Sequence, residues 1–368
     1  MKMKRLLCIV NELNYGGAET FLMKVYRCID KAKYQFDFIV TENTNGIYED
    51  EVRKLGGRVF EIPYRTKNPV KAFLALKDIV RKNRYFYVLK LSDTPIGIFD
   101  ILSVRIGGAG WVSVRSCNSS SDASLLKQII YIAIRPVFCS LTDQMIAPSL
   151  GAARYTFGKK NLDQVTIIHN GIDTTQFSYT REQSLQIRKK LGIEKKKVYG
   201  HIGRFNKQKN HVFLIEIFKE IIHIEKESVL LLVGYGELRD KIKSYVRTLG
   251  VEEKVIFYGT TNDVPSVLSV FDAMLFPSLY EGLPNVVIEA QCVGVPCLIS
   301  DTITREVKVT PLVHYCSLDF TAKYWADRAM KLISRKKSNR TYKKMMSEAG
   351  YDIEDVRSLF ISSTFNES

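Results

Sequence analysis

Histidine is scarce in this chain, with five among 368 residues and none before His169. Long apolar runs are missing too, because no uncharged stretch reaches the ~18 residues that a membrane-spanning helix needs. The nearest, Gln128–Leu141, is interrupted by Arg135 and Pro136. We therefore expect no helix that spans a membrane. The opening segment, MKMKRLLCIV, predicts a buried first strand and not a secretory signal, since no small-residue cleavage site follows it.

The cysteines lack the patterns of a disulfide framework or a zinc site. There are seven, an odd number, and no CxxC pair occurs. Most lie in apolar segments, which is typical of reduced thiols in a cytoplasmic protein. No group of cysteines and histidines has the spacing of zinc ligands, so we expect no metal.

Acidic residues are too few to balance the basic ones. The formal net charge is +15, and the excess is shared along the chain, with no basic tail. Such a field suits nucleotides, other polyanions or an anionic membrane surface. A solvated basic surface without a partner is the alternative, and it stays open. Nucleic acid is not predicted, because no recognition motif accompanies the charge.

Short apolar segments alternate with amphipathic ones along the whole chain, which predicts an α/β fold with parallel sheets covered on both faces. The pattern restarts at Val198–Gly203. We predict an N-terminal domain over residues 1–177, a C-terminal domain over 178–350, and a last helix and tail over 351–368. Two doubly wound domains should face a cleft between the carboxyl ends of their strands. The strands expected in the first domain are Leu6–Val10, Phe36–Val40, Arg58–Ile62, Tyr87–Leu91, Trp111–Val114, Gln144–Ala147 and Val165–Ile168.

The first motif, NELNYGGAET, joins a strand end to a helix start. Gly16 and Gly17 would let the backbone approach a ligand, and the helix start would offer free N–H groups to a phosphate. The motif is not the GxGxxG fingerprint, so a nicotinamide cofactor is not supported. A plain strand-to-helix turn remains the alternative.

Two further motifs carry glycines at strand ends. HNGIDTTQF, from His169, has the Asn-Gly pair of a tight turn and is interpreted as structural, although His169 could line the cleft. VGYGELRDKI, from Val233, either binds a ligand or permits close packing against a neighbouring loop.

GHIGRFNKQKN places a glycine, Gly203, at a strand end, with Arg204 directly after it and Lys209 before the next helix. Two fixed cations there would grip a pyrophosphate and neutralise charge that builds on a phosphate leaving group. An ordinary pair of surface cations is the alternative.

SLYEGLPNVVIEAQ carries two carboxylates, Glu281 in a loop and Glu289 in the helix that follows. Pro284 suits a first helical turn, and Asn285 continues it. Carboxylates accept hydrogen bonds in pairs, which suits the vicinal diols of sugars. The alternatives are a helix cap for Glu281 and a buried salt bridge for Glu289.

At these residues the chain resembles the retaining GT-B glycosyltransferases of family 4. Glu281 and Glu289 match the E-x7-E motif of that family, and four other motifs, NYGGAE, HNGID, GRFNKQKN and GYGEL, follow in order between residues 4 and 301. The nearest subgroup builds capsular or exopolysaccharide. The resemblance implies a GT-B architecture and no need for metal, and the chain has no Asp-x-Asp motif.

The resemblance also implies roles for individual residues. Arg204 and Lys209 would bind the donor diphosphate, and Glu281 the transferred sugar or that diphosphate. Glu289 would bind the ribose hydroxyls. The remaining substrate-binding residues expected from it are Gly16, Gly17, Asn118, Gly203, Gly282, Leu283, Pro284 and Asn285.

The chain departs from the family in its first domain. Related enzymes often carry histidines after the fourth and fifth strands, where this chain has VLKLSDTP and VSVRSCNSS. Arg115 and Cys117 stand where a His-x-His-Asn pattern is expected, and Asn118 remains. Arg115 could therefore serve a different acceptor. Asn210 follows Lys209 where glycine is usual.

The leading hypothesis is transfer of a hexose, with retention, from a UDP- or GDP-linked donor in surface polysaccharide assembly. The nucleotide sugar is a substrate, and no cofactor is expected. The acceptor would be a glycan or a polyprenyl-diphosphate-linked sugar, and contact with the inner face of the plasma membrane would be peripheral. Basic-aromatic runs near residues 63–87 and 125–138 are candidates for that contact, or are ordinary helices packed on the sheet.

Two other hypotheses stay open. One is a weakened glycosyltransferase that acts as a scaffold in a synthesis complex, for which the missing histidines argue. The other is a sugar-nucleotide epimerase of similar architecture, which would need acid–base residues in its cleft.

Overall fold

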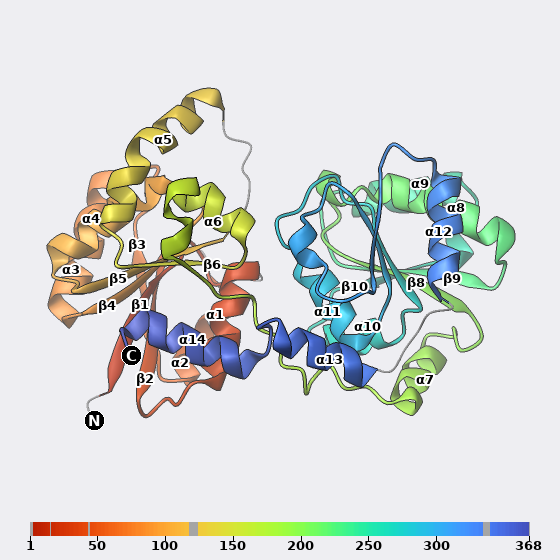
Figure 1. Ribbon diagram of the computed structural model, residues 1–368, viewed down its shortest axis with the longest axis horizontal. Helices are drawn as coiled ribbons and strands as arrows, with labels where there is room; N and C mark the ends of the chain where they lie inside the picture. Colours follow the sequence, from red (N-terminus) through yellow and green to blue (C-terminus); the bar gives the residue numbers. More distant parts are fainter. Residues whose placement is uncertain (1–2, 15, 43–44, 118–123, 334–338, 368) are drawn as a thin grey trace. The chain divides into compact units, whose positions relative to one another are not determined.

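The computed structural model describes residues 3–14, 16–42, 45–117, 124–333 and 339–367 (Figure 1). The chain forms two compact units. Unit 1 comprises residues 1–172 together with 350–368, and unit 2 comprises residues 173–349. The sequence placed the boundary five residues later and treated the last helix as a separate tail. In the structure that helix is part of unit 1.

Unit 1 is built on a seven-stranded sheet whose described strand pairs are parallel, in the order β3-β2-β1-β4-β5-β6-β7. Its strands are β1 (Lys4–Ile9), β2 (Tyr34–Thr41), β3 (Val59–Ile62), β4 (Tyr87–Ser92), β5 (Trp111–Ser116), β6 (Gln144–Ala147) and β7 (Val165–Ile167). All seven were expected, and no end differs from its expected position by more than two residues. β-branched and aromatic residues fill these segments, and their near-continuous apolar character follows from burial on both faces.

Helices cover both faces of this sheet. They are α1 (Gly17–Cys28), α2 (Glu49–Lys54), α3 (Pro69–Asn83), α4 (Ile98–Gly107), α5 (Leu125–Ser140), α6 (Leu150–Phe157) and α14 (Ile353–Phe365), with the short 3-10 helices η1 (Pro95–Gly97) and η2 (Lys159–Gln164). One core lies under α1, α2 and α14, and a second lies under α3, α4, α5 and α6. The doubly wound arrangement predicted for this part is confirmed.

The last helix completes the first of these cores. Phe360 and Phe365 are fully buried, and the Phe360 ring lies 5.5 Å from that of Phe21. The indole N–H of Trp111 donates to the carbonyl of Ser363 at 3.2 Å. Just before the helix, a parallel bridge pairs Ile172 with Asp352. Burial of two phenylalanines is worth several kcal/mol, so α14 is an integral part of unit 1.

Unit 2 holds a six-stranded sheet, with described strand pairs all parallel, in the order β10-β9-β8-β11-β12-β13. Its strands are β8 (Lys197–Ile202), β9 (Ser228–Val233), β10 (Val255–Gly259), β11 (Ala273–Phe276), β12 (Cys297–Ser300) and β13 (Val313–Cys316). Its helices are α7 (Arg181–Lys190), α8 (His211–Ile224), α9 (Arg239–Thr248), α10 (Val264–Ser269), α11 (Asn285–Val293), α12 (Ala322–Ile333) and α13 (Asn339–Glu348), with 3-10 helices η3 (Lys207–Lys209), η4 (Glu252–Lys254) and η5 (Arg305–Val307). A core of buried side chains lies under α8, α9 and α12.

Each sheet reverses its strand order once. In unit 1 the reversal lies between β1 and β4, and in unit 2 between β8 and β11. Connections leave in opposite directions at such a point, so the loops that follow the two strands leave room for a ligand. Among the described residues, no helix is both long and apolar enough to cross a bilayer.

Candidate functional site

The strand reversal of unit 2 brings two predicted motifs together. The loop after β8 holds Gly203, Arg204 and Lys209, and the loop after β11 holds Glu281. β8 and β11 are hydrogen-bonded neighbours, with Tyr199 opposite Ala273. Lys209 and Glu281, which are 72 positions apart in the sequence, therefore lie at the same edge of the sheet.

Lys209 and Glu281 form a direct ion pair. Lys209 Nζ donates to Glu281 Oε1 at 2.5 Å, and the side chains are only 14% and 8% exposed. The ammonium group also lies 4.7 Å from the centre of the Phe276 ring. Charge-assisted hydrogen bonds in a partly desolvated position are among the stronger ones in proteins. The pair thus fixes one cation and one carboxylate at the end of the sheet.

Backbone hydrogen bonds hold the two loops in register. Asn206 caps η3, because its side-chain oxygen accepts from the N–H of Lys209 at 3.2 Å. The N–H of Leu279 donates to the carbonyl of Gln208 at 2.8 Å. The Gln208 side chain in turn donates to the carbonyl of Tyr280 at 2.9 Å. Lys209 and Glu281 are therefore held by their own backbones as well as by each other.

Arg204 is placed differently. Its side chain is 59% exposed, with a loose 3.5 Å contact to Glu237 and the Tyr235 ring 5.6 Å from its guanidinium carbon. An exposed pair of this kind contributes little to stability. Arg204 is therefore an exposed, weakly held cation at the same sheet edge as the buried Lys209, and it can turn toward an anionic ligand at small energetic cost.

The glycines of VGYGEL are required by close packing between loops. A Cβ at Gly234, whose φ is +142°, would lie 2.0 Å from the carbonyl oxygen of Gly203. A Cβ at Gly236, whose φ is +149°, would lie 2.5 Å from that of Phe205. The sequence left open binding or packing for this motif, and these distances support packing against the Arg204 loop.

Two buried histidines lie beneath this loop. His201 Nδ1 is 2.9 Å from the carbonyl of Leu275, while its Nε2 and both nitrogens of His211 have no hydrogen-bond partner among the described residues. The two rings are 4.8 Å apart. Burial lowers the pKa of His211 to about 4 and that of His201 well below its ordinary value, and the charge of Lys209 acts in the same direction. Both rings are neutral near pH 7.

Helix α11 starts directly after the Glu281 loop. Pro284 is its N-cap and Asn285 its first residue, so the positive end of the helix dipole lies next to the Glu281 loop. Glu289 lies one turn further and is half-buried. Gly282 and Leu283 form the short link between Glu281 and the helix. The structure thus gathers every residue predicted in the C-terminal domain at one edge of unit 2.

The structure of unit 1 explains why the first motif has a glycine at position 16. A Cβ at Gly16 would lie 2.1 Å from a carboxylate oxygen of Glu19, so glycine leaves room for that side chain at the start of α1. Burial raises the pKa of Glu19, and the nearby Glu12 and Asp93 raise it further. Gly17 is the first residue of the helix. Glu19 is not among the site residues predicted from the sequence.

Arg115 is a core residue and not an exposed cation. It is 1% exposed, its guanidinium carbon lies 3.7 Å from the centre of the Phe21 ring, and it donates to Asn170 Oδ1 at 2.7 Å. Burial lowers its pKa to about 10. The hypothesis that Arg115 meets an acceptor is corrected, since a surrounded guanidinium has no face for one. Burial raises the pKa of the Cys117 thiol to about 12, and the Asn118 prediction lies outside the described residues.

HNGID has a structural use within unit 1. His169 stacks on Tyr351 with ring centres 4.2 Å apart, and its Nδ1 lies 2.9 Å from the carbonyl of Pro148. A Cβ at Gly171 would lie 2.6 Å from Ile353 of α14. The motif packs against the C-terminal segment, which supports the structural interpretation.

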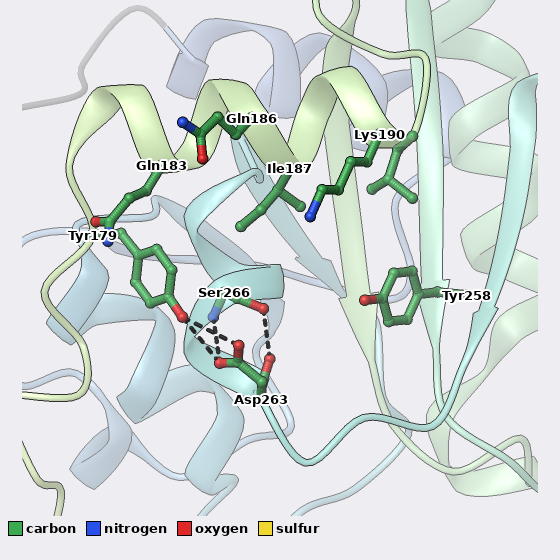
Figure 2. Close-up of a pocket in the computed structure, with 9 residues that line it drawn as sticks. Tyr179, Gln183, Gln186, Ile187, Lys190, Tyr258, Asp263 and Ser266 are labelled. Carbon is green, nitrogen blue, oxygen red and sulfur yellow. Dashed lines mark hydrogen bonds between the residues drawn. The ribbon is translucent and has the colours of Figure 1, made fainter.

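A shallow pocket of about 330 Å³ lies elsewhere in unit 2, between α7 and the segment of Tyr258 and Asp263 (Figure 2). The Tyr179 hydroxyl donates to both oxygens of Asp263 at 3.1 and 3.2 Å. No predicted site residue lines it. Among the described residues, no group of three or more His, Cys, Asp or Glu side chains is arranged to hold a metal ion.

Two doubly wound parallel units in one chain, the second with a lysine–glutamate pair and an exposed arginine at its strand reversal, are the arrangement of the GT-B class of glycosyltransferases. The family model described as "Glycosyltransferase Family 4" matches residues 15–176, and the one described as "Glycosyl transferases group 1" matches residues 183–351. The protein EpsF of Bacillus subtilis strain 168 is 31% identical over 366 residues, covering 95% of this chain and 94% of EpsF. The chain therefore belongs to the GT-B glycosyltransferases of family 4.

Other similar proteins agree with this membership. An Escherichia coli protein named UDP-Gal:alpha-D-GlcNAc-diphosphoundecaprenol alpha-1,3-galactosyltransferase is 25% identical, covering 78% of this chain and 76% of its own. The crystal structure of HepE from Anabaena in complex with UDP has a TM-score of 0.78 at 16% identity, covering 99% of this chain and all of HepE. At that identity, the structural likeness shows the GT-B fold.

Proposed function

We propose that this glycosyltransferase moves a hexose from a UDP-linked donor to a lipid-linked sugar during surface polysaccharide assembly, with retention of configuration. The names of similar proteins support it: EpsF, the diphosphoundecaprenol galactosyltransferase, and the capsular polysaccharide glycosyltransferase CapH of Staphylococcus aureus. HepE, a structural neighbour, was crystallised with UDP and with UDP-glucose, which favours UDP over GDP as the nucleotide.

The Lys209–Glu281 pair carries the proposal. A carboxylate beside a diphosphate would repel it, unless a cation stands between them. Lys209 is that cation, since it contacts Glu281 at 2.5 Å and can share its remaining protons with a phosphate oxygen. Glu281 is then free to accept hydrogen bonds from sugar hydroxyls. This assigns Lys209 to the diphosphate and Glu281 to the hexose.

The other residues of this edge complete the donor site. Arg204, being exposed, closes onto the diphosphate and neutralises charge as the bond to the sugar breaks. The backbone of Gly282, Leu283, Pro284 and Asn285, at the positive end of α11, lies against the donor, and Glu289 accepts from the ribose hydroxyls. Two cations balance the leaving diphosphate, so the proposed reaction needs neither metal nor cofactor.

Retention follows from attack on the same face that the leaving group occupies. The acceptor oxygen forms its bond to the anomeric carbon as the bond from that carbon to the phosphate oxygen breaks. The acceptor proton moves to the departing phosphate oxygen. No protein base is required, so the missing histidines of unit 1 do not prevent this reaction, which depends on positioning and charge stabilisation.

A lipid-linked acceptor implies peripheral membrane contact, and α5 is suited to it. Leu126, Ile129, Ile132 and Val137 are each more than half exposed, and the helix has no acidic residue. A helix packed only against the sheet would not present so many apolar side chains to water. We assign α5 to the surface of an anionic bilayer. Ile129→Ser/Ile132→Ser should lower cosedimentation with anionic vesicles and leave the melting temperature unchanged, and unaltered cosedimentation would contradict the assignment.

The experiment that tests the function is a donor and acceptor panel. The purified protein is incubated with radiolabelled UDP- and GDP-sugars, with and without lipid-linked sugar acceptors, in buffer with EDTA. We expect labelled lipid product with one UDP-sugar, and a loss of about 10²–10³ in kcat for Arg204→Ala with unchanged stability. Donor binding without product for every acceptor would refute transfer and favour a scaffold. Donor isomerisation without acceptor would refute it in favour of an epimerase.

A further inference from the structure

Unit 1 contains a group of cations that the donor chemistry does not use. Lys90 Nζ contacts Asp100 Oδ2 at 2.8 Å, and Arg65 Nε donates to Asp100 Oδ1 at 3.0 Å. Lys90 and Asp100 are buried, and Arg65 is about three-quarters buried. Two cations share one carboxylate, so the group keeps a net positive charge in a desolvated place.

The donors of this group are not all satisfied. Arg65 Nη1 reaches Asn11 Oδ1 only at 3.4 Å, and Arg65 Nη2 is buried with no hydrogen-bond partner among the described residues. Burial would raise the pKa of Asp100, but Lys90 and Arg65 outweigh it and lower that pKa. Asp100 is therefore ionised and supplies one negative charge against two positive ones, so a further anion would be needed to match the remaining positive charge.

The group lies where a ligand of unit 1 should bind. Lys90 is in β4 and Asn11 follows β1, the two strands at which the order of the sheet reverses. Asp100 is in the first turn of α4, and Arg65 lies four residues before α3. α3 and α4 pack side by side on one face of the sheet, and each follows a parallel strand (Figure 1). Their N-terminal ends add to the positive potential at this edge.

Charges of both signs occur at this edge. Lys67 precedes α3 and Lys71 lies in its first turn, so both add positive charge on the side of Arg65. Glu12 and Asp93 raise the pKa of Glu19 at the start of α1, and the charges of Asp93, Glu19 and Lys90 all act on Cys117. The lysines of the α3 segment therefore adjoin Arg65, and the acids gather about the start of α1.

Exposed apolar side chains adjoin the cations. Phe99, next to Asp100, is 63% exposed, Ile96 just before it is 44% exposed, and Val70 at the start of α3 is 70% exposed. η1, which contains Ile96, packs against α5, the helix that carries the further exposed apolar side chains described above. A cationic site beside an uncovered apolar strip matches a molecule with a phosphate group attached to a long hydrocarbon chain.

We propose that Arg65 and Lys90 bind the diphosphate of the lipid-linked acceptor, and that its hydrocarbon chain leaves along Ile96, Phe99 and α5. This rests on the proposed function, because it names the part of the acceptor that unit 1 recognises. Arg65 donates from its unpartnered nitrogen, and Lys90 shares its protons between Asp100 and the phosphate. The acceptor is selected for its charged linkage as well as for its sugar.

The kinetic test compares two acceptors that differ only in the phosphates. One is the lipid-linked acceptor found in the panel, and the other is the same sugar as an alkyl glycoside. Arg65→Gln and Lys90→Met should each raise the KM for the diphosphate acceptor at least tenfold, and leave the KM for donor and glycoside unchanged. Lys82→Met, at the far end of α3, is the matched control and should change none of these. Equal losses on both acceptors, or an unchanged KM, would overturn the proposal.

A binding test works even if no transfer is found. Farnesyl diphosphate is titrated into protein saturated with UDP, which occupies the donor site. We expect wild type and Lys82→Met to bind it and Arg65→Gln to bind at least tenfold more weakly, at a temperature at which circular dichroism shows all three proteins to be folded. Equal binding by all three refutes the site. Weaker binding of Arg65→Gln to anionic vesicles without farnesyl diphosphate would show recognition of lipid headgroups, and would also refute it. Absence of product in the panel, with this difference intact, would refute only the transfer reaction.

Discussion

Substitution of Lys209 should lower the stability of unit 2, independently of any effect on the reaction. Lys209→Met keeps the apolar stem that packs near Phe276 but leaves Glu281, only 8% exposed, without its cation. A buried carboxylate that loses its partner keeps its desolvation cost and loses the compensating attraction. The stability of the Lys209→Met variant therefore measures what the ion pair contributes to folding, apart from its role in binding a ligand.

The burial of the pair sets the size of the effect. Breaking a buried pair costs about 3–5 kcal/mol, and the 14% exposure of Lys209 places this one at the lower end, about 3 kcal/mol. For a unit of this size, each kcal/mol shifts the melting temperature by about 2–4 °C, so the shift should be about 6–12 °C. Glu281→Gln should cost less, because the amide oxygen can still accept from Lys209.

A double-mutant cycle measures the coupling. Urea unfolding of wild type, Lys209→Met, Glu281→Gln and the double variant gives the interaction energy, which should be about 1–3 kcal/mol. Lys344→Met is the matched control, since its contact with Glu348 is exposed and should be worth under about 0.5 kcal/mol. Single-variant losses that simply add in the double variant would refute the reasoning, as would a Lys209→Met loss no larger than that of Lys344→Met.

Three further outcomes are expected. Gly234→Ala should lower the free energy of unfolding in urea by about 2 kcal/mol or more, because its Cβ would overlap the carbonyl of Gly203. Gly250→Ala, whose Cβ has open space, should lower it by about 1 kcal/mol. Equal losses would contradict the packing argument. The free energy of unfolding should fall as the pH drops from about 6.5 toward 4, by about 1.4 kcal/mol per pH unit for each buried neutral histidine. His211→Phe should make that fall shallower. An unchanged slope would show that His211 is not neutral in the folded protein. Phe360→Ala should cost about 3–5 kcal/mol and lower the thermal stability of unit 1, as calorimetry would show; a cost below 1 kcal/mol would mean that α14 is not part of that core.

The fold could be predicted because its signals are local. A buried parallel strand must be a short apolar run, and each run between Leu6 and Ile168 became a strand with ends close to those expected. The donor side was equally readable, since Arg204, Lys209 and Glu281 follow strands that the alternating pattern already orders. The sequence did not show that Lys209 and Glu281 pair in the absence of a ligand, because this depends on the order of β8 and β11 in the sheet.

Residues outside recognisable motifs could not be assigned. Arg65 and Asp100 lie 35 positions apart and meet only because α3 and α4 pack side by side. Arg115 was misinterpreted because a cation after a strand is usually exposed, and only the packed Phe21 ring reveals its burial. Glu19 was not assigned to a site, because the glycine pair before it already explained the turn.

The return of α14 to unit 1 has a consequence for synthesis of the chain. Residues 173–349 are all made before Ile353–Phe365, so unit 2 can finish folding while the core around Phe21 still lacks its last helix. Until then a groove lined with aromatic side chains stays open to water or to a chaperone. Ribosome-bound chains that stop before α14 should therefore be protease-sensitive in their first 170 residues, although those residues emerged first.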